Sequence, residues 1–270
     1  MTDGIKKPKM FLRLISDLHY EHYETEAEKK QFWKIFTGWV GDVKPNTYLL
    51  LAGDLCQAFK KGRPNPDYEE LLRTIRERYL FQGVIFIAGN HEFYDSYRQR
   101  SAVIERLKEV AKRTKCIFLH RSSVQIDGIL TVAGTTLWSN IIPCAAEQIN
   151  DFNLQNAFGH SSEAVGEHLL HVQWLSQLQV KTPHQVLLTH HLPTCHLVHS
   201  KYRDSKLNSA YASELLSLLN LDKVDYIFSG HTHEQISYEV PGTSTLCITN
   251  PLGYPNEHRE TRLIRAEFKI

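Results

Sequence analysis

The 270-residue sequence predicts an α/β domain built on two mixed β-sheets. In the first half of the chain, apolar runs of strand length alternate with amphipathic helices, which is typical of parallel strands joined by helical crossovers. Residues 117–133 instead hold three short strands, and Asp127-Gly128 is a two-residue hairpin signal that predicts antiparallel pairing. No repeat, low-complexity tract or linker interrupts the sequence, so we expect a single domain spanning residues 1–270.

A capping box marks the start of the first predicted helix. The Thr25 side chain is placed to accept a hydrogen bond from the backbone of Glu28, whose carboxylate can reach back to Thr25. Apolar residues then recur at helical spacing and predict one buried face: Phe32, Phe36, Trp39 and Val40. Strands are predicted on either side of this helix, at residues 10–15 and 47–52, because both runs are almost wholly apolar.

The remaining elements follow from the same two periodicities. Further helices are predicted around residues 71–75, 96–113, 164–178 and 212–219, with Val165, Leu169, Val172 and Leu175 facing inward in the helix at 164–178. Further strands are predicted at residues 84–88, 117–119, 124–126, 129–133, 185–189, 226–228, 236–240, 245–249 and 263–268. Residues 139–160 show no clear period, and the polar loop at 192–207 is long enough to suggest a function.

Composition narrows the class of protein. Lys plus Arg (31) nearly balances Asp plus Glu (30), which argues against non-specific nucleic-acid binding but leaves room for a small basic pocket. No apolar segment reaches transmembrane length, and the polar N-terminus lacks a signal-peptide core. The five cysteines are scattered without CxxC spacing, which is typical of reduced thiols. We therefore expect a cytoplasmic protein that binds no membrane; composition does not predict an oligomeric state.

Polar residues follow five predicted strands at the points where the apolar runs stop. They are Asp17 and His19, Asp54, Asn90-His91-Glu92, His190, and His231 and His233. Because ligand sites in α/β sheets lie at the carboxyl ends of strands, we expect these loops to converge. Seven ligands, His91 being held in reserve, exceed the needs of one tetrahedral ion and suit two ions that share a carboxylate. Imidazole, carboxylate and amide ligands without thiolate favour Mn, Fe or Zn.

Three glycines support this interpretation. Gly53, Gly89 and Gly230 each precede a candidate ligand, where a residue without Cβ permits a tight turn and close approach of the backbone to an ion or a phosphate.

The ordered motifs Asp-Leu-His, Gly-Asp, Gly-Asn-His-Glu, His and Gly-His-Thr-His resemble those of the calcineurin-like metallophosphoesterase superfamily. The resemblance spans residues 17–233, and five motifs in this order are far more specific than any one of them. It implies a four-layer α/β/β/α sandwich of two mixed sheets flanked by helices. Asp54 is followed by Leu55-Cys56-Gln57 instead of the continuation found in protein serine/threonine phosphatases, and other segments resemble a largely uncharacterised cytosolic branch.

The resemblance also implies a role for each residue. Asp17, His19 and His233 would bind one ion, Asn90, His190 and His231 would bind the second, and Asp54 would bridge them. The ions would be divalent or trivalent, with Mn expected first and Fe, Zn, Co or Mg as alternatives. A metal-bridging hydroxide would attack phosphorus, and His91 would protonate the leaving alkoxide or stabilise its charge. Glu92 would either orient His91 or form a surface ion pair.

We therefore expect a metal-dependent phosphohydrolase that cleaves phosphodiesters. A phosphomonoesterase using the same centre is the main alternative, followed by a nuclease and a non-catalytic scaffold. The substrate would be a small phosphoester, with nucleotide-like compounds among the options. Candidate substrate contacts lie in the loops after Asp54 and His190, where polar residues are common in any case: Lys60, His191, His196 and Arg203.

Overall fold

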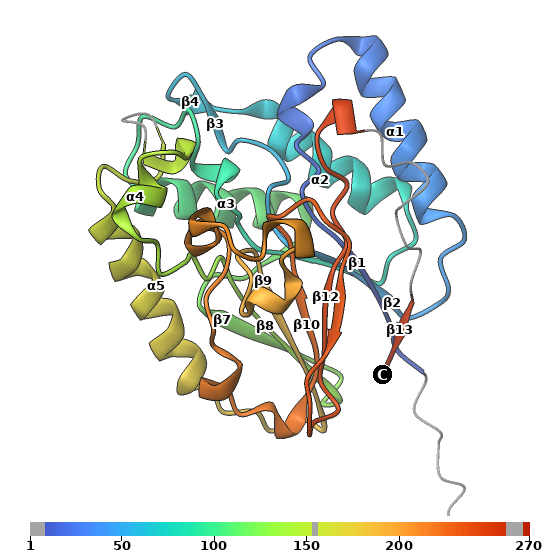
Figure 1. The fold of residues 1–270 in the computed structure, drawn as a ribbon. Helices are drawn as coiled ribbons and strands as arrows, with labels where there is room; N and C mark the ends of the chain where they lie inside the picture. Colours follow the sequence, from blue (N-terminus) through green and yellow to red (C-terminus); the bar gives the residue numbers. More distant parts are fainter. Residues whose placement is uncertain (1–8, 153–155, 258–266) are drawn as a thin grey trace, which may run out of the picture.

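The structure is a computed structural model and describes residues 9–152, 156–257 and 267–270. Its helices and sheets form the four layers that the resemblance implies, with two β-sheets packed face to face and helices on both outer sides (Figure 1). Apolar side chains of both sheets fill the space between them, among them Leu14, Leu50, Val132 and Phe228. Strands buried on both faces explain the nearly continuous apolar runs of the sequence.

The first sheet, counted over the described residues, has five strands in the order β13-β1-β2-β5-β6. Strands β1, β2, β5 and β6 are parallel, and β13 pairs with β1 in the antiparallel direction. Their bounds are β1 Phe11–Ile15, β2 Thr47–Leu51, β5 Gly83–Phe86, β6 Ile117–Phe118 and β13 Phe268–Lys269. Most of the strand predicted at 263–268 lies outside the described residues.

The second sheet, over the same residues, has six strands in the order β11-β12-β10-β9-β8-β7. The predicted hairpin is confirmed: β7 and β8 are antiparallel, and Asp127 and Gly128 have φ values of 51° and 65°, as a type I′ turn requires. The strands are β7 Ser122–Ile126, β8 Leu130–Thr135, β9 His184–Thr189, β10 Val224–Ser229, β11 Ser237–Glu239 and β12 Leu246–Thr249. A small hairpin, β3 (Phe59–Lys60) and β4 (Arg63–Pro64), was not predicted.

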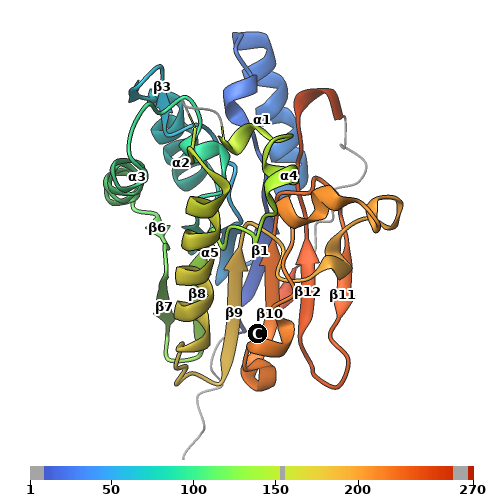
Figure 2. The same ribbon diagram turned by 60° about the vertical axis from the view of Figure 1, so that its left-hand side comes forward.

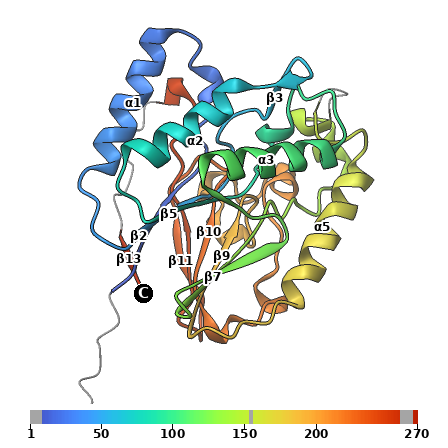
Figure 3. The same ribbon diagram turned by 180° about the vertical axis from the view of Figure 1, so that it is seen from behind.

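Three long helices cover the outer face of the first sheet: α1 (Glu26–Val40), α2 (Pro66–Arg78) and α3 (Arg100–Thr114) (Figure 3). The capping box of α1 is confirmed, since Thr25 and Glu28 exchange both hydrogen bonds. Helix α5 (Ser161–Ser176) covers the outer face of the second sheet (Figure 2), and α4 (Pro143–Ala146) is a single turn.

Two details of the predicted helices were wrong. Leu169 is 61% exposed, because α5 turns His168 and His171 inward instead, where the Nδ1 atom of His171 lies 3.0 Å from the backbone nitrogen of Leu137. No α-helix forms at 212–219, where the structure has 3₁₀ turns and irregular chain. The backbone of residues 212–219 pairs with the loop after β9, where the N–H of Ser213 donates to the carbonyl of Leu192 at 3.0 Å. This pairing between distant segments overrides the helical propensity of the residues.

The two sheets are joined at one end by the chain after β12. The backbone N–H of Leu252 donates to the carbonyl of Ser16, and that of Gly253 donates to the carbonyl of Asp17, both at 2.9 Å. This pairing places residues 250–257 beside the end of β1. All five cysteines are free thiols. Nowhere in the described part of the chain is a helix both long and apolar enough to cross a membrane.

Candidate metal centre

The five polar loops converge at the carboxyl ends of β1, β2, β5, β9 and β10, as predicted. The described residues contain three groups of side chains whose potential ligand atoms lie within 4.8 Å of one another. One consists of His19, Glu21, His22 and His91, and the other two consist wholly of predicted metal ligands. We call them the first cluster (Asp17, His19 and His233) and the second cluster (Asp54, His190 and His231).

The backbone at these positions is unusual. Asp17, His19, Asp54, His231 and His233 all have positive φ, between 45° and 74°. Left-handed conformations are uncommon outside glycine and carry an energetic cost, and such residues gather at functional sites.

Gly89 and Gly230 lie in tight contact with candidate ligands, while the predicted close approach of the glycine backbone to an ion or a phosphate stays a prediction. A Cβ atom on Gly89 would lie 2.1 Å from Oδ1 of Asp54, and one on Gly230 would lie 2.8 Å from Oδ2 of Asp17. Neither position has room for a side chain, so both carboxylates pack directly against backbone.

In the first cluster, two imidazole nitrogens face each other. Nε2 of His19 and Nε2 of His233 lie 2.8 Å apart, and Oδ1 of Asp17 lies 3.5 Å from the latter. Two bare lone pairs at this distance repel, so a proton or a cation must lie between them. Burial alone would lower the pKa of His233, but hydrogen bonds to Asp17 and Glu257 raise that pKa to about 10.

In the second cluster, His190 faces two oxygen atoms. Its Nε2 lies 3.3 Å from Oδ2 of Asp54 and 3.0 Å from Oδ1 of Asn90, while its Nδ1 is 2.8 Å from the carbonyl of Ala52. The Asn90 amide nitrogen donates to Asp151 at 2.9 Å, which turns the Asn90 oxygen toward His190. Burial opposes protonation of His190, but the charge of Asp54 raises its pKa to about 9.

These groups fit a pair of metal ions. Nε2 of His231 is buried with no hydrogen-bond partner, an uncompensated cost that a cation would remove. Burial beside His190 lowers the pKa of His231 to about 3, so its ring is a neutral ligand at pH 7. Oδ2 of Asp54 lies 3.8 Å from Nε2 of His19 and 3.3 Å from Nε2 of His190, so it stands between the two clusters.

Both interpretations of Glu92 were wrong. Its carboxylate is fully buried and accepts hydrogen bonds from the backbone nitrogens of Asp54 (3.1 Å), Leu55 (2.9 Å) and Gly89 (2.7 Å). Burial and the charge of Asp54 raise the pKa of Glu92 to about 8. Glu92 therefore ties the loop after β2 to the loop after β5 and does not touch the His91 ring.

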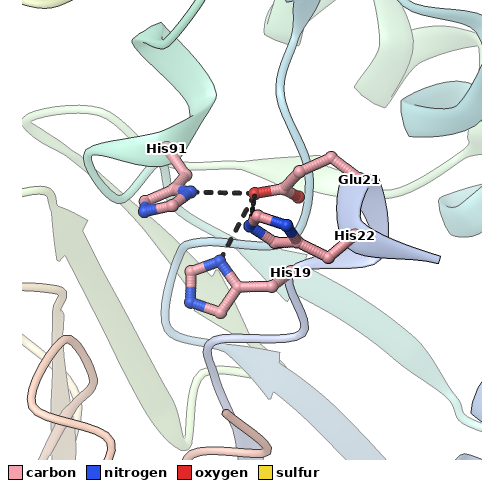
Figure 4. A group of neighbouring side chains, drawn as sticks. All are labelled: His19, Glu21, His22 and His91. Atoms are coloured by element: carbon pink, nitrogen blue, oxygen red, sulfur yellow. Dashed lines mark hydrogen bonds and ion pairs between the residues drawn. The ribbon is translucent and has the colours of Figure 1, made fainter. Parts of the chain in front are cut away.

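His91 is oriented by other residues. Its backbone N–H donates to Oδ1 of Asp54 at 2.8 Å, its Nδ1 lies 2.8 Å from Oε1 of Glu21, and its Nε2 lies 3.2 Å from the hydroxyl of Tyr254 (Figure 4 shows the side of the ring toward Glu21). The Nε2 end of the ring thus meets Tyr254, whose own ring packs against His19 and His233 of the first cluster with centroids 4.3 and 4.6 Å apart.

A cavity of about 480 Å³ opens beside both clusters. Asp54, His91, His231 and His233 line its floor, and its walls come from the segments 148–151 and 198–211 together with Tyr94 and Tyr254. The sequence showed no clear period at residues 139–160 and suggested a function for the loop at 192–207, and the structure places parts of both segments in the lining of this cavity.

None of the four candidate substrate residues lines this cavity. Lys60 is exposed on the β3–β4 hairpin, and Arg203 is exposed on the outer loop. The ring of His196 stacks on that of Tyr238 at 4.1 Å, away from the clusters, and His191 is buried behind His231, with ring centroids 4.2 Å apart. Of the four, His191 lies in ring contact with the candidate ligands His190 and His231, and a role in substrate binding stays a prediction.

Sequence reasoning missed three carboxylates next to the clusters: Glu21, Asp151 and Glu257. Oε2 of Glu257 lies 2.9 Å from Nδ1 of His233, and Asp151 holds Asn90. The only available signal was their position, two residues after His19 for Glu21 and within segments resembling the cytosolic branch for the other two.

Comparison with known proteins agrees with this geometry. Residues 12–235 match the model of the calcineurin-like phosphoesterase family, a class of metal-dependent phosphoesterases. The chain therefore belongs to the calcineurin-like phosphoesterase family. Among curated protein sequences, none matches it.

Solved structures share the fold at low sequence identity. Phosphopantetheinyl hydrolase (PptH) from Mycobacterium tuberculosis is 17% identical with a TM-score of 0.68, over 97% of this chain and 96% of that one. The protein TT1561 of Thermus thermophilus is 14% identical with a TM-score of 0.53, over 97% and 99%. GAP50 of Plasmodium, described as an anchor in the inner membrane complex, is 14% identical with a TM-score of 0.52, over 90% and 71%.

Proposed function

We propose that this protein is a metal-dependent phosphohydrolase that cleaves phosphodiester bonds. The observation that carries the proposal is the position of His91: it lines the cavity beside two clusters of metal-binding side chains, and its Nε2 lies 3.2 Å from the hydroxyl of Tyr254, which lines the same cavity. A histidine placed there can serve an ester oxygen that leaves from a phosphorus bound at the clusters.

We assign the ligands as the sequence predicts. Asp17, His19 and His233 would hold one ion, Asn90, His190 and His231 would hold the other, and Asp54 would be available to both. Two ions, Mn²⁺ by preference, would supply positive charge that acidifies water and neutralises phosphoryl oxygens when bound.

The protein's own groups do the rest. The carbonyl of Ala52 and the carboxylate of Glu257 fix the rings of His190 and His233 through their Nδ1 atoms. The Nε2 atom of His91 is available to donate a proton to the leaving oxygen, once that oxygen replaces the Tyr254 hydroxyl as its partner.

The role of His91 fits alkyl esters of phosphate in general, and the size of the cavity favours a diester over a monoester. An alkoxide leaves poorly without a proton, so His91 matters most for esters with alkyl leaving groups. The cavity extends from the clusters to Tyr202 and Leu207, and about 480 Å³ is enough for a second substituent on phosphorus.

The test compares two substrates on the metal-reconstituted protein. We expect kcat/KM to be higher for bis-(4-nitrophenyl) phosphate than for 4-nitrophenyl phosphate, and a strong preference for the monoester would overturn the diester assignment in favour of a phosphomonoesterase. Asp54→Asn and His231→Ala, each checked for fold by circular dichroism, should lower turnover by at least about 100-fold because each removes a metal ligand.

A non-catalytic scaffold is the second candidate, because GAP50 shares the fold and is described as an anchor. Absence of turnover in the metal-reconstituted wild type would favour it, as would turnover that both ligand variants retain in full and that therefore does not arise at this site. A nuclease is a weaker candidate, since the net charge is only +1. A screen for the natural substrate should include cyclic nucleotides, dinucleotides, nucleotide diphosphates, phospholipid head groups and, because of PptH, phosphopantetheinyl esters.

A further inference from the structure

Glu21 is a buried carboxylate for which the ligand assignment above gives no role. It lies in the 3₁₀ turn Tyr20–His22, directly after His19, whose left-handed backbone (φ 45°) reverses the chain. The Glu21 side chain is only 6% exposed, and its Oε2 is buried without a hydrogen-bond partner. Burying a charge in this way is costly, so the contacts of the other oxygen need an explanation.

Those contacts are with histidines of two different roles. Oε1 of Glu21 lies 2.8 Å from Nδ1 of His91 and 3.4 Å from Nδ1 of His19 (Figure 4). His91 comes from the loop after β5 and His19 from the loop after β1, so one oxygen atom joins two loops that are 70 residues apart in sequence.

We propose that Glu21 is the positioning residue for both rings, which deepens the proposed function and rests on it. An ionised carboxylate only accepts hydrogen bonds, so each Nδ1 that faces it carries the proton. This arrangement fixes which nitrogen is left for chemistry. In His91 the free atom is Nε2, which faces the Tyr254 hydroxyl and the cavity; in His19 it is Nε2, which faces His233 and Asp54.

The geometry favours this role over a third metal site. His22 completes a group of four potential ligands, but its Nε2 lies 3.8 Å from Glu21 and its side chain is 47% exposed. An ion bound there would need Nδ1 of His19 while Nε2 of the same ring serves the first cluster.

The first arm of the test measures leaving-group dependence. Aryl methyl phosphates with leaving phenols of pKa from about 7 to about 10 would be assayed with wild type, Glu21→Ala, Glu21→Gln, His91→Asn and the double variant Glu21→Ala/His91→Asn. Exposed Glu24→Ala is the matched control, because it removes a carboxylate three residues away and leaves the site intact.

We expect Glu21→Ala to lose about 10–100-fold in kcat on the poorest leaving group and under about 3-fold on 4-nitrophenolate, as orienting partners of functional histidines typically do. Glu21→Gln should recover part of the loss, because its amide oxygen can still accept from Nδ1–H of His91. At saturating Mn²⁺, which offsets the loss of the His19 contact, the double variant should be no slower than His91→Asn alone. A loss equal for all leaving groups, or additive losses in the double variant, would overturn the proposal.

The second arm needs no turnover. Calorimetric titration of the metal-free protein with Mn²⁺ should show one of two binding events weakened about 10-fold in Glu21→Ala and neither changed in Glu24→Ala. Unchanged affinities, or a third ion per chain that Glu21→Ala loses, would overturn the proposal. If wild type hydrolyses no phosphoester, the proposed function fails, whereas this arm still decides whether Glu21 orients His19.

Discussion

Replacing Glu257 by glutamine removes the negative charge behind His233 while keeping the shape of the side chain. Oε2 of Glu257 lies 2.9 Å from Nδ1 of His233 and also accepts from the backbone nitrogen of Tyr254 at 2.8 Å. A glutamine oxygen can keep both hydrogen bonds, so the turn that carries Tyr254 is retained. The substitution lowers the basicity of the His233 imidazole, and therefore its affinity for an ion at Nε2.

The size of the effect follows from this contact. Loss of a carboxylate partner of a ligating histidine typically lowers metal affinity by about 10–100-fold, which corresponds to about 1.4–2.8 kcal/mol. Calorimetric titration of metal-free protein with Mn²⁺ is the assay, and exposed Glu239→Gln is the control. The binding event at the first cluster should weaken, and the event at the second cluster should stay within about twofold. Equal weakening of both events, or of neither, would refute the assignment of His233.

Three further predictions follow. Glu92→Ala leaves three buried backbone N–H groups without their acceptor. The free energy of unfolding should therefore fall by about 3 kcal/mol and the melting temperature by about 6–12 °C. An unchanged melting curve would contradict the role of Glu92 in joining the loops after β2 and β5. Gly89→Ala puts a Cβ atom 2.1 Å from Oδ1 of Asp54, so the purified variant should hold fewer ions per chain than wild type by elemental analysis, and an equal metal content would count against Asp54 as the shared ligand. The pKa values of His190 and His233 are raised to about 9 and about 10, so a proton must leave each ring before an ion binds. Mn²⁺ affinity should therefore rise from about pH 6.5 to about 8 by up to about tenfold per pH unit for each displaced proton. Calorimetry in buffers of different ionisation enthalpy counts these protons, and an affinity independent of pH would contradict the ligand assignment.

The parts of the site that sequence could predict are those set by local geometry. Asp17 and His19 follow a buried strand, and the carboxyl ends of parallel strands meet at one edge, so convergence of the ligand loops within each sheet follows from strand pattern. The approach of His190 from the other sheet depends on how the two sheets pack. Thr25 and the Asp127-Gly128 turn were predictable for the same reason, because each depends on residues within a few positions.

The parts that escaped prediction depend on contacts between distant segments. Glu92 adjoins His91 in sequence, but the 3₁₀ turn His91–Phe93 sends its carboxylate back to the loop after β2. Glu21 takes the role expected of Glu92, and nothing in its neighbourhood specifies a partner 70 residues away. Likewise, residues 212–219 have helical spacing, yet pairing with the loop after β9 decides their conformation.

Metal stoichiometry of turnover tests the central claim most directly. Protein stripped of metal by a chelator would be titrated with Mn²⁺ while hydrolysis of bis-(4-nitrophenyl) phosphate is recorded. If the two clusters share Asp54, the protein should show no turnover without metal, and the rate of hydrolysis should rise until two ions are bound per chain. The Asp54→Asn variant should show no such rise. Full activity in the stripped protein, or saturation at a single ion, would contradict a binuclear centre built from these five loops.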